Sequence, residues 1–146
     1  MSDFYIIDAN GNKVPYGIQG LPKRVVAINT ATTLTMADSG SELVLSHTAG
    51  VAITLPPAIG NLGFNVKVRT SASFATTNFT IASPEEDIYG GAIVNSVFVP
   101  ADAENRINFV ATAETVGDYV EVISDGNQYL VSGVGASAGS ITFTVV

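Results

Sequence analysis

The sequence predicts an all-β protein, an antiparallel β-sandwich or jelly-roll-like barrel that follows an N-terminal extended arm. Two observations support this fold class. Val and Ile outnumber Leu while Thr is frequent, a balance that favours strands over helices. Short runs of alternating apolar and polar residues are divided by Gly, Pro, Asn-Gly and Asp-Gly at intervals of about eight to twelve residues, which is typical of sandwiches and barrels.

The arm is expected over residues 1–23, and a single β-domain over residues 24–146. A glycine- and proline-containing link joins the two parts, and a hairpin turn is expected at Asn10–Gly11. The arm contains an apolar patch of four residues, Phe4, Tyr5, Ile6 and Ile7. This patch is either an ordinary edge strand of the core or a strand that pairs with a partner's sheet. The acidic flanks and the link favour the partner-binding arm.

The segment 50–81 contains the clearest strand pattern of the domain. Residues 51–55 and 64–69 each alternate with period two, and Pro56–Pro57, Gly60 and Gly63 punctuate the loop between them. Such a pair is expected to form a building block of an antiparallel sheet.

The remaining strands are predicted from the same alternation and from the turn residues at their ends. They fall, in chain order, at residues 24–29, 32–36, 43–47, 79–81, 88–89, 93–99, 106–111, 119–123, 129–132 and 141–145. Pro100 is expected to end the apolar run before it, and residues 101–105 could form a single helical turn at most. The small residues 133–139 would let the last strand pair at a distance.

Composition points to an assembly protein and against several other classes. Charged residues make up 13%, about half the usual share of roughly 25%, so part of the surface is expected to be buried against other chains. A polar surface of Thr, Ser and Asn is the alternative. The net charge of -7 repels phosphate backbones and anionic membranes, which argues against direct binding to either.

No cofactor, metal site or catalytic activity is expected. The chain has no cysteine, and its one histidine, His47, lies on the same predicted face as Leu43 and Leu45, as a structural residue would. The N-terminus lacks the pattern of a signal peptide, so synthesis in the host cytoplasm is expected. Five carboxylates form two groups that could hydrolyse glycosides or bind calcium, although in such loops they are usually solvated: Glu85, Glu86, Asp87, Asp102 and Glu104.

Several short motifs resemble β-structured modules of tailed-bacteriophage virions, found in head decoration (cement) proteins and in tail-fibre or appendage proteins. They are ITLP at 53–56, GFNVKV at 63–68, NFTI at 78–81, IYGG at 88–91 and ISDGNQYLVSG at 123–133. The resemblance implies a non-enzymatic module that forms a homotrimer and, in decoration proteins, clamps neighbouring capsomers. Tyr129 stands where a fibre module often has Trp, and the chain has no long shaft. The missing shaft, together with the small size and the N-terminal arm, favours decoration over fibre.

Three functions follow as hypotheses. The first is a phage head decoration protein on the capsid surface of the virion, which binds the major capsid protein and itself, as a homotrimer, and stabilises the head. The alternative is a tail-fibre or receptor-binding module for a host surface glycan or protein, in which Tyr89, Tyr119 and Tyr129 would cluster in one groove. A remote third, a carboxylate hydrolase, would depend on Glu86 or Asp102.

Overall fold

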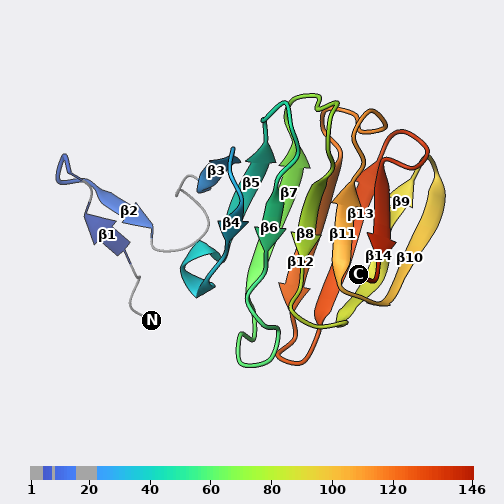
Figure 1. Cartoon of the computed structure of the whole chain (residues 1–146). Coiled ribbons are helices and arrows are strands. Elements are labelled where there is room, and N and C mark those ends of the chain that lie inside the picture. Colours follow the sequence, from blue (N-terminus) through green and yellow to red (C-terminus); the bar gives the residue numbers. More distant parts are fainter. Residues whose placement is uncertain (1–4, 8, 16–22) are drawn as a thin grey trace.

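The computed structural model describes residues 5–7, 9–15 and 23–146, and arranges the domain as two packed β-sheets (Figure 1). The seven-stranded sheet has the order β10 (Val97–Glu104), β9 (Ile88–Val94), β13 (Tyr129–Gly135), β12 (Tyr119–Ser124), β7 (Asn65–Thr70), β5 (Ser41–Leu45) and β3 (Val25–Ile28). The five-stranded sheet has the order β14 (Ile141–Thr144), β11 (Arg106–Phe109), β8 (Phe79–Ala82), β6 (Ala52–Thr54) and β4 (Thr32–Thr33). The predicted all-β sandwich is confirmed.

The first half of the domain winds like a short solenoid. From β3 to β8 each successive strand changes sheet, so that β3, β5 and β7 are parallel neighbours in one sheet and β4, β6 and β8 are parallel neighbours in the other. From β9 onward most pairings are antiparallel. Both sheets are therefore mixed, because a strand that returns after a visit to the opposite sheet runs in the same direction as its predecessor.

The core lies between the inner faces of the two sheets. Among the residues whose burial the structure describes, the buried hydrophobic ones fall between Ile28 and Ile141. Two edge-to-face aromatic pairs fill the layer, Phe74 with Phe79 at 4.8 Å between ring centroids and Phe64 with Tyr129 at 6.3 Å. Such pairs add to the stabilisation that apolar burial provides.

The two strands of the segment 50–81 are present, but they do not pair with each other. β6 belongs to the five-stranded sheet and β7 to the seven-stranded sheet. The loop between them crosses the end of the core, where the buried Tyr129 hydroxyl donates a 2.5 Å hydrogen bond to the Pro56 carbonyl. The expected antiparallel pairing of these two strands is wrong, because period-two alternation reports which side of a strand is buried and carries no information about its neighbour.

The run 93–99 is a hairpin rather than one strand. Asn95 and Ser96 adopt φ of 49° and 65° and form the turn between β9 and β10, a conformation that Asn tolerates better than most residues. Pro100 does not end the run; it lies within β10, an edge strand, where a missing N–H is tolerated. Residues 101–105 continue β10 to Glu104 with a bulge at Ala103, so no helical turn forms there.

In the N-terminal arm, β1 (Tyr5–Ile7) and β2 (Lys13–Pro15) form the predicted hairpin, which includes Gly11 at φ 83°. This two-stranded sheet is separate from the two domain sheets, so β1 is not an edge strand of the core. Phe4 lies outside the described residues. Of the apolar patch at residues 4–7, the side chain of Ile7 is exposed. Binding of a partner by this patch remains a prediction.

The two-layer core predicts a sharp contrast between two phenylalanines. Phe79 is 0% exposed and Phe98 is 57% exposed. Phe79→Ala should lower the free energy of unfolding by about 3–5 kcal/mol, because it removes buried apolar contacts and leaves a cavity. Phe98→Ala, the matched control, should cost about 1 kcal/mol or less. Urea denaturation followed by circular dichroism measures both; equal losses would contradict the assignment of inner and outer faces.

Candidate interaction surface

The outer face of the seven-stranded sheet divides into two chemically different halves. On β9, β10, β12 and β13 the outward positions form what we call the apolar half: Tyr89, Ile93, Phe98, Pro100, Ile123, Leu130 and Val134. On β3, β5, β7 and β12 the charged half comprises Lys23, Glu42, Lys67, Arg69 and Glu121. Strand register, rather than distance along the chain, brings each set together.

The apolar half spans four strands in two rows. In one row Val134 lies opposite Ile93, and Ile93 lies opposite Phe98. In the other row Leu130 lies between Ile123 and Tyr89. An outward row that contains Ser132 and Gly91 lies between the two. Apolar side chains at directly opposed positions touch one another, so each row forms a strip of exposed apolar side chains. Patches of this kind mark interaction surfaces.

The ring of Phe98 lies against Gly91 on this face. A Cβ built on Gly91 would lie 2.6 Å and 2.8 Å from two atoms of the Phe98 ring and 2.4 Å from the Val99 carbonyl oxygen. The ring therefore covers the bare backbone of Gly91, whose φ of 151° also favours glycine. This arrangement presents the outer side of the ring to a partner.

Ion pairs link all the charges of the charged half, in which three cations and two carboxylates leave a net charge of +1. Glu42 accepts from Arg69 Nε at 2.8 Å and lies 3.5 Å from Lys23 Nζ, while Lys67 Nζ lies 3.4 Å from Glu121. The hydrogen bond from Arg69 holds the pKa of Glu42 below its ordinary value, and the nearby Lys23 adds to this effect. Exposed pairs of this type contribute little to stability individually, so their main effect is on the potential of the face.

Tyr119 lies under both cations of β7. Lys67 Nζ is 4.3 Å and the Arg69 guanidinium carbon 5.1 Å from the centroid of its ring. These cation–π contacts cover the tyrosine at the border between the two halves.

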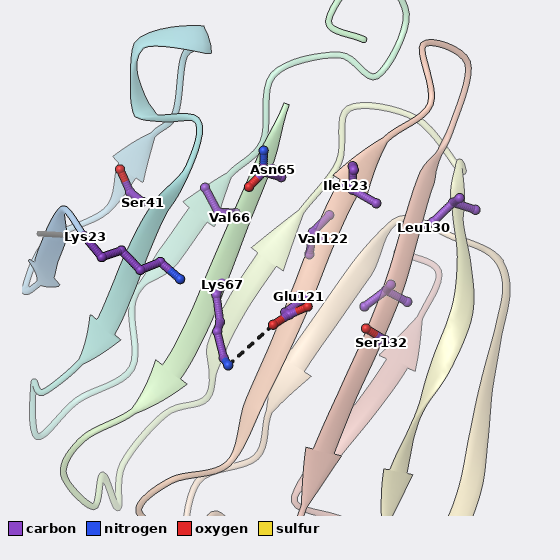
Figure 2. Close-up of a pocket in the computed structure, with 11 residues that line it drawn as sticks. Lys23, Ser41, Asn65, Val66, Lys67, Glu121, Val122, Ile123, Leu130 and Ser132 are labelled. Carbon is purple, nitrogen blue, oxygen red and sulfur yellow. Dashed lines mark ion pairs between the residues drawn. The ribbon is translucent and has the colours of Figure 1, made fainter. Parts of the chain in front are cut away.

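A trough of about 350 Å³ runs along this border (Figure 2). Ile123 and Leu130 supply its apolar part, and the Lys67–Glu121 ion pair lies within it. Its other polar lining groups come from four residues, Lys23, Ser41, Asn65 and Ser132. A shallow site with amide, hydroxyl and charged groups around aliphatic side chains can accept a polar chain such as a peptide or a saccharide.

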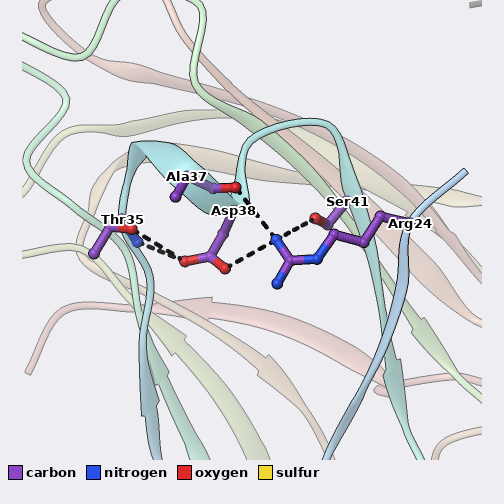
Figure 3. Close-up of polar contacts among 5 residues, drawn as sticks. All are labelled: Arg24, Thr35, Ala37, Asp38 and Ser41. Atoms are coloured by element: carbon purple, nitrogen blue, oxygen red, sulfur yellow. Dashed lines mark hydrogen bonds and ion pairs between the residues drawn. The ribbon is translucent and has the colours of Figure 1, made fainter.

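Arg24 contacts Ser41, one of the residues that line the trough, and connects it to neighbouring segments (Figure 3). Its Nη1 lies 3.2 Å from the Ala37 carbonyl, 3.3 Å from Asp38 and 3.5 Å from Ser41 Oγ. Asp38 in turn accepts from the Thr35 N–H at 2.8 Å, which closes the 3₁₀ turn η1 (Met36–Asp38). The start of β3, this turn and the start of β5 are thereby tied together.

The tyrosines do not gather in one groove. Tyr89 and Tyr119 lie on the outer face, but Tyr129 is fully buried and its pKa is raised, mainly by desolvation and secondarily by Asp87. A groove in which all three tyrosines cluster, as expected for a receptor-binding module, is therefore not formed. The sequence pattern does not show that the Tyr129 side chain points into the core, because this depends on the register of the strand after the Asp125–Gly126 turn.

His47 lies just after the end of β5 and is exposed, outside the buried face that Leu43 and Leu45 occupy. Its Nδ1 lies 2.8 Å from the Ala49 carbonyl oxygen and 3.2 Å from the Ala49 backbone nitrogen. These contacts bend the chain locally after the strand.

The carboxylates singled out from the sequence do not form one site. Glu85 and Glu86 are exposed, whereas Asp87 is buried and accepts a 2.5 Å hydrogen bond from Ser83 Oγ. Asp102 and Glu104 lie at the end of β10. Within the described residues no group of three or more His, Cys, Asp or Glu side chains could hold a metal ion.

Comparison with known proteins adds no relative. No protein-family model matches the chain, and no curated protein and no solved structure is significantly similar to it. In the described part of the chain, no helix is long and apolar enough to cross a membrane.

The apolar half was not recognised from the sequence. Its members come from four strands, and Ile93 and Phe98 meet only because the chain turns at Asn95–Ser96. The signal that could have revealed it is this Asn-Ser pair inside an apolar run, since Asn tolerates the positive φ that a tight hairpin requires.

Asp87 gives a testable pH dependence. Burial raises its pKa in the folded protein above the ordinary value of about 4. The folded state then holds this proton more tightly than the unfolded state, so the carboxyl lowers stability as pH rises from about 4 through the raised pKa. Asp87→Asn, which can still accept the Ser83 hydrogen bond, should raise the urea midpoint at pH 7, and the gain should vanish near pH 4. Glu86→Gln in the same exposed loop is the control; a gain that is independent of pH would refute the assignment.

Proposed function

We propose that this chain is a structural protein of a tailed-bacteriophage virion, a head decoration protein that binds the outer capsid surface and stabilises the head. The observation that carries the proposal is the apolar half, two rows of exposed apolar side chains on the outer face of the seven-stranded sheet. The sequence motifs that resemble virion β-modules supply the biological context.

The chemistry of the apolar half suits a protein partner. Its members come from regular strands and are held by cross-strand neighbours, so little conformational entropy is lost when they are covered. Burial of apolar surface contributes roughly 25 cal/mol per Å². The internally paired charged half beside it resembles the polar rim of a protein interface.

In this proposal the partners are the major capsid protein and further copies of the same chain, assembled as a homotrimer on the capsid surface. Association of copies would multiply weak individual contacts with the shell, since linked binding sites act at high effective concentration. No catalytic role is proposed.

A tail-fibre or receptor-binding module is the second candidate, and the trough favours it. Asn65, Ser132 and the Lys67–Glu121 pair present donors and acceptors around aliphatic side chains, as a saccharide site would. Burial of Tyr129 removes one of the aromatic residues on which a sugar ring could stack. Copy number separates the two functions: electron microscopy of the virion should show the chain as hundreds of copies on the head, and a few copies on the tail would support the second candidate.

The apolar half can be tested with a charge at its exposed phenylalanine, Phe98 on the edge strand β10. Phe98→Asp should weaken binding to heads stripped of this protein by at least about tenfold, because burial of a Phe side chain contributes about 1.5–3 kcal/mol and a tenfold change corresponds to 1.4 kcal/mol. Ile59→Asp places the same charge at an exposed apolar residue away from this face and should bind normally. Co-sedimentation with stripped heads measures both; equal binding of both variants would contradict the proposed surface.

A further inference from the structure

The sheet edges of the domain differ in how they are protected. Edge strand β10 contains Pro100, a bulge at Ala103 and two carboxylates, all features that discourage pairing with another strand. β4 is only two residues long, and β14 lies beside β10, where the two sheets approach each other. β3, with the sequence VVAI, has none of these features. It is the edge best suited to accept an additional strand.

The free hydrogen-bonding groups of β3 can be assigned from its register. The Glu42 N–H donates to the Arg24 carbonyl at 2.9 Å, and Val25 is the Cα partner of Glu42 in a parallel ladder. Because successive residues of a strand direct their backbone groups to opposite sides, Arg24, Val26 and Ile28 face β5. The N–H and C=O groups of Val25 and Ala27 therefore point to the side of β3 on which the described part of the chain places no strand.

The N-terminal hairpin has one strand that is suited to pair with such an edge and one strand that is protected against pairing. β1, with the sequence YII, carries no proline or charge, whereas β2 contains Lys13 and Pro15, two residue types that protect edges. Ile7 of β1 and Val25 of β3 are exposed apolar side chains, 57% and 59% respectively. If β1 paired with β3, β2 would become the new and protected edge of the sheet.

We propose that the hairpin of one copy adds β1 antiparallel to β3 of a second copy, so that each chain donates a hairpin and accepts one. This deepens the proposed function, because it rests on self-association and names the contact that carries it. The donated hairpin would cap the open end of the solenoid-like half, as terminal caps do in repeat proteins. A contact between two different surfaces of this kind closes into a ring when the rotation permits, and a trimer is such a ring.

The connection between hairpin and domain favours a second copy over the same chain. With β1 antiparallel to β3, β2 would run parallel to β3, and a chain that joins parallel strands of one sheet usually needs about a dozen residues or more. Nine residues, 16–24, separate Pro15 from Val25. Antiparallel pairs are also the commoner kind.

Two variants separate the donor from the acceptor. Ala27→Pro removes an outward N–H and blocks the accepting edge, while the hairpin stays intact; Ala27→Thr keeps the N–H and is the matched control. A chain without residues 1–15 keeps the accepting edge and loses the hairpin, and it retains the core described for the two sheets, whose residues lie between Ile28 and Ile141. Circular dichroism and urea denaturation verify that each variant is folded.

Light scattering coupled to size exclusion gives the masses. The parent chain and Ala27→Thr should assemble, whereas Ala27→Pro alone and the shortened chain alone should be monomers. An equimolar mixture of Ala27→Pro and the shortened chain should form a one-to-one complex. In this complex Ala27→Pro supplies the hairpin and the shortened chain supplies the free edge of β3. A mixture that stays monomeric, or an Ala27→Pro variant that assembles like the parent, overturns the exchange of hairpins. A monomeric parent chain refutes self-association itself, and the two failures are thereby distinguished.

Discussion

The structure depends on one constraint, namely that two sheets must bury each other's inner face while the chain passes back and forth between them. Leu43 and Leu45 of β5 belong to the same core as Ile53 of β6 and Phe79 and Ile81 of β8, which lie in the other sheet. Most strands of the two sheets therefore keep apolar residues at alternate positions, whereas the short β4 consists of two threonines. Since β3 to β8 change sheet at each step, parallel pairing and an open end of the sandwich follow directly.

This constraint explains what could be predicted from the sequence. Alternation is a local property, so the positions of most strands, the hairpin turn at Asn10–Gly11 and the all-β class could be predicted. Pairing is a non-local property. That β6 and β7 lie in different sheets depends on contacts of the connecting loop with distant residues, such as the hydrogen bond from Ser124 Oγ to the Ala58 carbonyl at 2.9 Å. No pattern within residues 50–70 contains this information.

The apolar half and the buried tyrosine illustrate the same limit. Tyr129 and Leu130 are neighbours, yet one is buried and the other lies in the exposed patch, because successive residues of β13 point to opposite faces. A shift of register by one residue would exchange them. Composition alone led us to expect apolar side chains on the surface; only the register shows that they gather on β9, β10, β12 and β13.

The low content of charged residues has a different explanation on each of the two outer faces of the sandwich. On the five-stranded sheet most outward positions carry small or polar residues besides Arg106, and the buried Asn108 donates to the hydroxyls of Thr142 and Thr144, both at 3.2 Å. Hydroxyl groups keep this face polar with little charge. On the seven-stranded sheet four of the six basic residues lie toward β3 and each contacts an acidic partner, so the opposite half is left apolar. The two explanations of the composition, a surface of Thr, Ser and Asn or a surface for assembly, therefore describe opposite sides of one sandwich. A molecule built in this way can bind a partner with one side and remain soluble through the other.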